Sequence, residues 1–274
     1  MLKDFMKVGV AALTVALLGV LAVGLTADEI LDRMDAEADA LAEGNMVSII
    51  KFHNDFADGT DNEYRFGSLS KPGFSLIYFI EPLELRGSAF LTHDAQEEGE
   101  ENRLWMYFPF FGSQPPKQLI TEEDRSGSFA DSSLSFEDIG DQDQREDYDA
   151  VVLHEEDLVI GDLTRTAYVI ESTANPGVDT DTPRTVLWVD AEFFIMLKAE
   201  SYSDLGNLES TMEVMKLGEF EGKLTTDEMV ATNVLDGSST TITFLDRRRP
   251  DVDIPDEVFS VDNVSSFDPA VWGF

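Results

Sequence analysis

Residue types that often carry catalysis are scarce and scattered in this chain. The three histidines, His53, His93 and His154, lie far apart and form no HExxH pair of the kind that holds a catalytic zinc ion. The sequence contains no cysteine, no GxSxG elbow and no GxxxxGK[ST] phosphate loop. Carboxylate pairs are too frequent among 55 acidic residues to indicate glycoside hydrolysis. We predict that the protein is not an enzyme, with a hydrolase built from converging acids as a remote alternative.

Metal binding has one partial signal. Residues 141–147, DQDQRED, begin like a calcium loop with acids two positions apart. Glu146 stands at the sixth place, where the loop needs glycine, and no glutamate stands at the twelfth. Residues 178–181 and 251–256 also alternate acids with other types. We predict solvated acidic loops, with neither a metal site nor a cofactor.

Arg247, Arg248 and Arg249 form a basic run in an otherwise acidic chain. They follow a predicted strand that ends near Leu245 and precede Pro250, which predicts a loop at the end of a sheet. Their guanidinium groups could pair with acids of the same protein, or could bind an acidic partner or a lipid phosphate through directed hydrogen bonds. The sequence leaves this choice open.

The elements around these residues are mostly strands. Residues 74–139 contain apolar runs broken by Pro82 and Gly87 and ended by prolines, so each piece has the length of a strand. We predict strands at 74–80, 86–91 and 103–108. Both alternating sets of 74–80 are apolar, which indicates that both faces are covered or that one is kept for an apolar guest.

The rest of the chain predicts an amphipathic helix followed by more strands. Residues 27–43 place Leu31 and Met34 on one side at helical spacing, with Thr26 or Asp28 as cap and Gly44 as end. Further strands are expected at 46–54, 63–69, 150–160, 164–172, 184–189, 195–201, 208–217, 228–233 and 239–244. The fold class is α+β, mostly β, with an open or closed antiparallel sheet.

Several segments carry a resemblance to a family. EPLELRGSAFL, RLWMYFP and SFADSSLSFEDI follow one another in an order that resembles the outer-membrane lipoprotein-sorting, LolA-like proteins of bacteria, in their divergent stand-alone periplasmic branch. The resemblance extends from residues 25–35, LTADEILDRMD, to residues 254–264, IPDEVFSVDNV. It implies a strongly curved antiparallel sheet, a half-open barrel with covering helices, whose concave apolar face shelters acyl chains. Residues 126–139 resemble the family segment that leads from the sheet into a short helix, with Asp131 or Ser133 as possible caps.

This resemblance also suggests which residues would meet lipid. We expect the lining to come from one alternating set across three strands, with two adjacent phenylalanines at the rim. The predicted lipid-binding residues are Ile77, Phe79, Phe90, Trp105 and Tyr107 in the lining and Phe110 and Phe111 at the rim. Their alternative role is ordinary core beneath the helices.

The amino terminus has the pattern of an export signal. Two lysines precede an apolar run at 8–23, and Ala22 and Gly24 supply small residues where a signal peptidase would cleave. We predict a signal peptide at 1–24 and a single domain at 25–274, located in the periplasm. Cleavage after Ala27 and an uncleaved membrane anchor are the alternatives.

The charge of the chain restricts its partners. The formal net charge is −36, or −37 once the +1 of Lys3, Asp4 and Lys7 is removed with the leader. Such a surface repels nucleic acid and anionic headgroups at long range. Without cysteine, the chain also cannot carry a lipid on a cysteine after its leader.

The resemblance to the lipoprotein-sorting family implies a periplasmic carrier or chaperone that binds a lipidated protein or lipid acyl chains and transfers them toward the outer membrane. An inner-membrane transporter and an outer-membrane acceptor are the implied partners. The alternative is a non-catalytic docking protein of an inner-membrane exporter of the resistance-nodulation-division type. A filled interior with a flat apolar patch would favour that alternative.

Overall fold

The fold is a single antiparallel sheet that runs through nearly the whole chain. The structure, a computed structural model, describes residues 24–95, 102–111, 114–140, 147–178, 180 and 182–274. These residues form a 13-stranded sheet in the order β6-β5-β4-β3-β2-β1-β13-β12-β11-β10-β9-β8-β7. The strands are β1 Met46–Asp55, β2 Asp61–Lys71, β3 Phe74–Glu81, β4 Ala89–His93, β5 Arg103–Tyr107, β6 Lys117–Leu119, β7 Tyr148–Ile160, β8 Leu163–Ala174, β9 Arg184–Asp190, β10 Met196–Tyr202, β11 Leu208–Phe220, β12 Lys223–Asn233 and β13 Ser238–Arg248.

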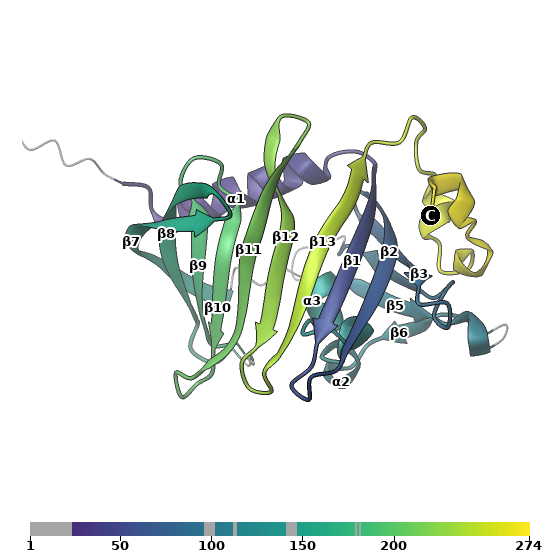
Figure 1. Ribbon diagram of the computed structural model, residues 1–274, viewed down its shortest axis with the longest axis horizontal. Coiled ribbons are helices and arrows are strands. Elements are labelled where there is room, and N and C mark those ends of the chain that lie inside the picture. Colours follow the sequence, from purple (N-terminus) through teal and green to yellow (C-terminus); the bar gives the residue numbers. More distant parts are fainter. Residues whose placement is uncertain (1–23, 96–101, 112–113, 141–146, 179, 181) are drawn as a thin grey trace, which may run out of the picture.

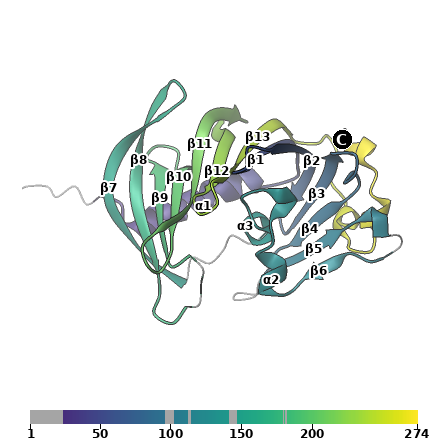
Figure 2. The same cartoon turned by 60° about the horizontal axis from the view of Figure 1, so that its bottom comes forward.

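The sheet is strongly curved and stays unclosed, with β6 and β7 at its edges. Helices α1 (Ala27–Ala42) and α3 (Phe136–Gly140) lie on its concave side, between the two ends of the sheet (Figures 1 and 2). Helix α2 is the single turn Glu122–Arg125. The predicted fold class, a curved antiparallel sheet with covering helices, is confirmed.

Helix α1 begins with a capping box. Thr26 accepts a hydrogen bond from the Glu29 backbone N–H, and the Glu29 carboxylate accepts one from the Thr26 N–H. Its first turns bury Ala27, Ile30 and Leu31 against β8 and β9, while most of its second half is exposed or half-buried. The helix is therefore anchored to the sheet by its amino-terminal half.

Both faces of β2 to β5 are covered by the protein itself. On the convex face, Leu76, Tyr78 and Leu91 pack under a carboxy-terminal segment of 3-10 helices, at Asp256–Phe259, Val264–Ser266 and Pro269–Trp272. On the concave face, Phe79 and Phe90 pack under the segment that contains the 3-10 helix Phe129–Asp131 and α3. Double covering explains why both alternating sets of 74–80 are apolar.

Three details differ from the sequence-based expectations. The α3 cap is Ser135, whose hydroxyl accepts a hydrogen bond from the Asp138 N–H at 3.0 Å, rather than Asp131 or Ser133. Strand β13 runs to Arg248 because a bulge lets it continue beside β1, so Arg247 and Arg248 lie in a strand and not in a loop. The short edge strand β6 was not expected.

The predicted leader at 1–24 falls almost wholly outside the described residues, as does the calcium-like stretch at 141–146. Across the described part of the chain, no helix is long and apolar enough to span a membrane.

Candidate functional site

Between β10 and β13, large apolar side chains gather on the concave side of the sheet, and the convex side is mostly polar. In β12, Met229 and Ala231 point to the concave side, while Glu228, Val230 and Thr232 point to the convex side. In β13, Ile242 and Phe244 are concave, and Thr241 and Thr243 are convex. This alternation is typical of an antiparallel sheet with one wet face, whose apolar face needs a cover.

The strand register shows that this apolar face continues to the surface on which α1 packs. Thr240 of β13 pairs with Ala231, Ala231 with Met212, and Met212 with Ala199 of β10. Ala199 pairs in turn with Leu187, and Leu187 with Ile170, which α1 covers. The row is therefore one continuous concave surface.

The cover over the middle of this surface is incomplete within the described residues. Ala231 and Ile242 are buried, with 3% and 5% exposure. Four larger neighbours, which we call the concave floor, are only partly buried: Ile50, Met212, Met229 and Phe244. The second half of α1 buries little of its own surface, so it leaves this part of the sheet without a tightly packed partner.

Arg247 lies beside the concave floor. Its guanidinium carbon is 3.8 Å from the centre of the Phe244 ring, and its side chain is 12% exposed. It donates hydrogen bonds to the Thr225 hydroxyl at 3.2 Å and to the Thr226 carbonyl oxygen, while Asp227 lies 3.6 Å away. Burial lowers the pKa of Arg247, and Asp227 offsets part of this effect. The arginine thus places a buried positive charge at one end of an apolar surface.

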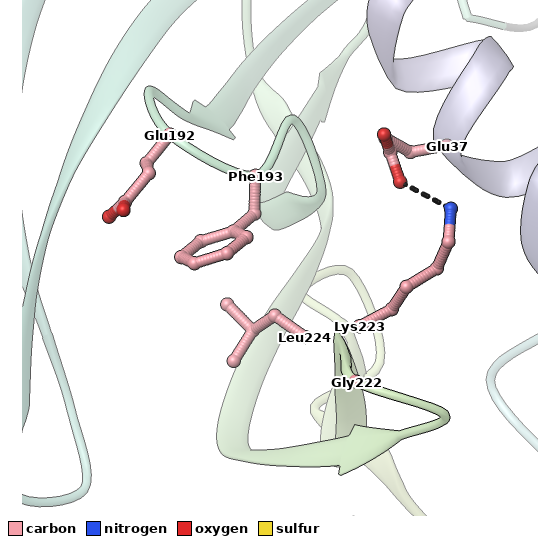
Figure 3. A pocket seen from close by; sticks show the side chains of 6 residues that line it. All are labelled: Glu37, Glu192, Phe193, Gly222, Lys223 and Leu224. Carbon is pink, nitrogen blue, oxygen red and sulfur yellow. Dashed lines mark hydrogen bonds and ion pairs between the residues drawn. The ribbon is translucent and has the colours of Figure 1, made fainter.

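A hollow opens at the rim of the sheet, where α1 meets two hairpin turns. Its volume is about 210 Å³, and it is lined by Glu37, Glu192, Phe193, Gly222, Lys223 and Leu224. The Phe193 and Leu224 side chains face one another, and Lys223 forms an ion pair with Glu37 at 2.8 Å (Figure 3). Lys223 is two residues from Thr225, the hydrogen-bond partner of Arg247. The hollow is therefore close to the Arg247 end of the floor.

The five predicted lining residues do not share one face. Ile77 and Phe90 pair with each other and lie on the concave face with Phe79. Trp105 pairs with Leu91 and Tyr107 with Ala89, so both lie on the convex face under the carboxy-terminal segment. The expectation of a single alternating set is wrong for Trp105 and Tyr107, because the β4–β5 register places Leu104 and Met106 on the concave side instead.

Four of these five residues are tightly packed by the protein's own side chains: Phe79, Phe90, Trp105 and Tyr107 are at most 9% exposed. Ile77 is partly buried. At the expected rim, Phe110 lies in the 3-10 helix Pro109–Phe111 and is 55% exposed. The Phe111 side chain is outside what the structure describes. Binding of lipid by any of these seven residues stays a prediction.

The residues of the concave floor were not among the predicted lining residues, although the alternation of apolar and polar residues in their strands could have indicated them. Met212 lies between Thr211 and Glu213, and Ile242 lies between Thr241 and Thr243, which predicts strands with one apolar face. The runs within residues 74–108 are more apolar than those of β11 to β13, but their high apolar content reflects covering on both faces.

Titratable clusters give no support to a catalytic or metal centre in the described part of the chain. No group of three or more His, Asp or Glu side chains is placed there to hold a metal ion. His53 and His154 each lie 3.5 Å from an acid two residues away along the same strand.

Comparison with known proteins agrees with the curved antiparallel sheet described above. A family model described as an uncharacterized protein matches residues 74–266, well over half of the chain. The chain belongs to this family. Its fold is LolA-like, and no curated protein matches the sequence significantly.

Three solved structures show the same fold along nearly their whole length. A DUF1329 family protein from Desulfovibrio piger is 23% identical, with a TM-score of 0.73 over 85% of this chain and 96% of that one. An outer membrane lipoprotein-sorting protein domain from Vibrio parahaemolyticus is 22% identical, with a TM-score of 0.70 over 86% and 97%. A LolA superfamily protein from Nitrosomonas europaea is 24% identical, with a TM-score of 0.62 over 86% and 98%.

Proposed function

We propose that this protein is a non-catalytic periplasmic carrier that holds lipid acyl chains, free or attached to a lipoprotein, and passes them toward the outer membrane. The observation that carries the proposal is the concave floor, an apolar surface that the described residues leave partly uncovered. A LolA-like fold shared with a lipoprotein-sorting domain supports it. The proposal includes a leader at 1–24 and one exported domain at 25–274.

The physical basis is transfer between apolar surroundings. Each methylene group that leaves water contributes roughly 0.8 kcal/mol, so an acyl chain on the floor is held against release into water. A membrane offers the same chain a similar environment, so a modest difference in affinity is enough for handover. Arg247, next to Phe244, would face the polar end of the ligand, because guanidinium groups bind ester and phosphate oxygens well.

The test is chemical analysis of what the protein carries. Protein purified without detergent is extracted with organic solvent, and the extract is analysed by mass spectrometry. We expect acyl lipid in the wild-type extract and at least about a tenfold loss in Met229→Asp, because a carboxylate on the floor must be desolvated when a chain binds.

Val230→Asp is the matched control. Val230 follows Met229 directly, is also partly buried, and points to the convex face. It should retain lipid. If the wild-type protein yields no lipid and takes up no added fatty acid, the carrier proposal fails, and a docking role beside an inner-membrane exporter becomes the better hypothesis.

A further inference from the structure

Phe129 is the centre of the aromatic cluster on the concave face. Its side chain is 1% exposed. Its ring lies within 6.0 Å, centre to centre, of five other rings: Phe52, Phe66, Phe79, Phe90 and Phe136. The first four of these rings come from the neighbouring strands β1 to β4. The Phe129 ring therefore packs on the concave face across all four strands.

The backbone that presents Phe129 is strained. Ala130 and Asp131 have φ angles of 52° and 55°, which residues with a side chain rarely adopt. Such a conformation persists only where the surroundings hold it, and strained positions of this kind concentrate at functional sites. Here the Asn54 amide donates to the Ala130 carbonyl oxygen at 2.9 Å, and the Tyr64 hydroxyl donates to Asp131.

Further hydrogen bonds tie this turn to the sheet. The Ser133 backbone N–H donates to the Thr240 hydroxyl at 2.8 Å, and that hydroxyl donates to Asn54 at 2.8 Å. Asn54 is 1% exposed and Thr240 fully buried. The position of Phe129 is thus fixed by buried polar contacts as well as by apolar packing.

Phe129 lies between the filled part of the concave face and the concave floor, which the described residues leave partly uncovered. On one side, Phe79 and Phe90 fill the space above β3 and β4. On the other side, Phe52 pairs with Ile242, and Ile242 pairs with Met229 of the concave floor. Side-chain burial decreases along this row, from 4% exposure at Phe52 and 5% at Ile242 to the partly exposed Met229.

We propose that Phe129 closes the inner end of the concave floor and thereby limits the length of the acyl chain that the protein accepts. This inference rests on the proposed carrier function. A chain whose polar end lies near Arg247 and whose tail runs along Ile50 and Met229 meets the Phe129 ring near Phe52. Methylene groups beyond that point cannot be buried unless the ring moves.

The experiment measures the Kd of a series of saturated fatty acids, from decanoate to eicosanoate, by calorimetry with the full-length protein. For the wild type, affinity should rise with chain length and then level off or fall. In Phe129→Leu the optimum should move to longer chains, with Kd roughly fourfold lower for each additional methylene that becomes buried.

Phe259→Leu is the control, because Phe259 is equally buried but lies on the convex side. It should leave the optimum unchanged. If Phe129→Leu does not fold, Phe129→Met conserves more volume and should broaden the length profile. An unchanged optimum in a folded Phe129 variant overturns the length limit but leaves the carrier function intact, whereas absence of binding in the wild type overturns both.

Discussion

At the scale of single residues, the buried carboxylate of Asp190 holds residues that line the rim hollow. Its side chain has no exposed surface, and it accepts hydrogen bonds from Arg165 at 2.7 and 2.9 Å. It also accepts the backbone N–H groups of Glu192 and Phe193, which line the hollow. The Arg165 guanidinium in turn lies 4.9 Å from the centre of the Phe193 ring. Asp190 therefore fixes the turn that forms one wall of the hollow.

This arrangement predicts a pH dependence of stability. Burial alone would raise the pKa of Asp190, but the hydrogen bonds from Arg165 and from two backbone N–H groups outweigh it, so the pKa is lowered. A lowered folded-state pKa gives stability that is fully present above the unfolded value, about 3.9, and is lost as the pH falls through the folded value. Asp190→Asn should cost about 3–5 kcal/mol at neutral pH, with the deficit shrinking below about pH 4.

Urea unfolding of both proteins between neutral and acidic pH measures this difference. Glu192→Gln is the control, because Glu192 is a largely exposed partner of the same arginine and should change stability by less than about 1 kcal/mol. A deficit of Asp190→Asn that stays constant with pH would contradict the assignment.

At the scale of secondary-structure elements, each arginine of the run contacts a different element. Arg247 contacts β12, as described above. Arg248 donates to the Trp272 carbonyl oxygen in the last 3-10 helix. Arg249 donates to the Leu41 carbonyl oxygen of α1 at 2.9 Å and to that of Asn45 at 3.3 Å. A cation at this position satisfies a helix carbonyl without an intrahelical partner and suits the negative end of the helix dipole.

Replacing Arg248 or Arg249 should therefore lower the local stability of a different element. In Arg249→Gln, backbone amides in the second half of α1 should exchange with deuterium roughly three- to tenfold faster, as expected for the loss of hydrogen bonds worth about 1 kcal/mol. In Arg248→Gln the same increase should appear in the carboxy-terminal 3-10 helices instead. Hydrogen exchange followed by mass spectrometry measures both, and faster exchange of the same segments in the two variants would contradict separate roles.

Gly67 lies directly beneath the ring of the carboxy-terminal residue Phe274. It lies in the middle of β2 on the convex face, where a Cβ atom would overlap the ring of Phe274. Gly67→Ala should lower the free energy of unfolding by about 1–3 kcal/mol because the ring must move. Most of this loss should disappear in the Phe274→Ala background, as a double-mutant cycle of urea unfolding would show. Simple additivity of the two changes would mean that the ring does not occupy this place in solution.

At the scale of the whole molecule, charge governs which membranes the protein can approach. A net charge of −36 creates a long-range repulsion from anionic headgroups. Any acceptor of the proposed ligand should therefore present a neutral or basic surface.

Vesicle flotation tests this expectation. At low salt, phosphatidylglycerol vesicles should bind less protein than phosphatidylcholine vesicles, and the difference should shrink as the ionic strength rises above about 0.1 M, where the Debye length falls to about 10 Å. A preference for anionic vesicles at low salt would indicate a basic contact surface that dominates over the net charge.

Much of the architecture followed from local sequence patterns. A cap at Thr26 or Asp28 and the apolar spacing of Leu31 and Met34 predict α1 because both signals act within a few residues. Alternation of polar and apolar residues at Thr241, Ile242 and Thr243 predicts a strand for the same reason. The extension of β13 to Arg248 was not predictable in this way, because it depends on a bulge opposite β1, nearly 200 positions away in the chain.

The sequence by itself determined the antiparallel strands, the first helix and the acidic surface, since these depend on neighbouring residues and on composition. Tertiary structure decided which apolar residues the described chain leaves partly uncovered and which pack into its core. Trp105 and Phe90 look alike as residues of apolar strands, yet the register between β4 and β5 places them on opposite faces. The cover of each face comes from distant segments around Phe129 and Trp272, so only their packing shows that the described residues leave the sheet near Met229 partly uncovered.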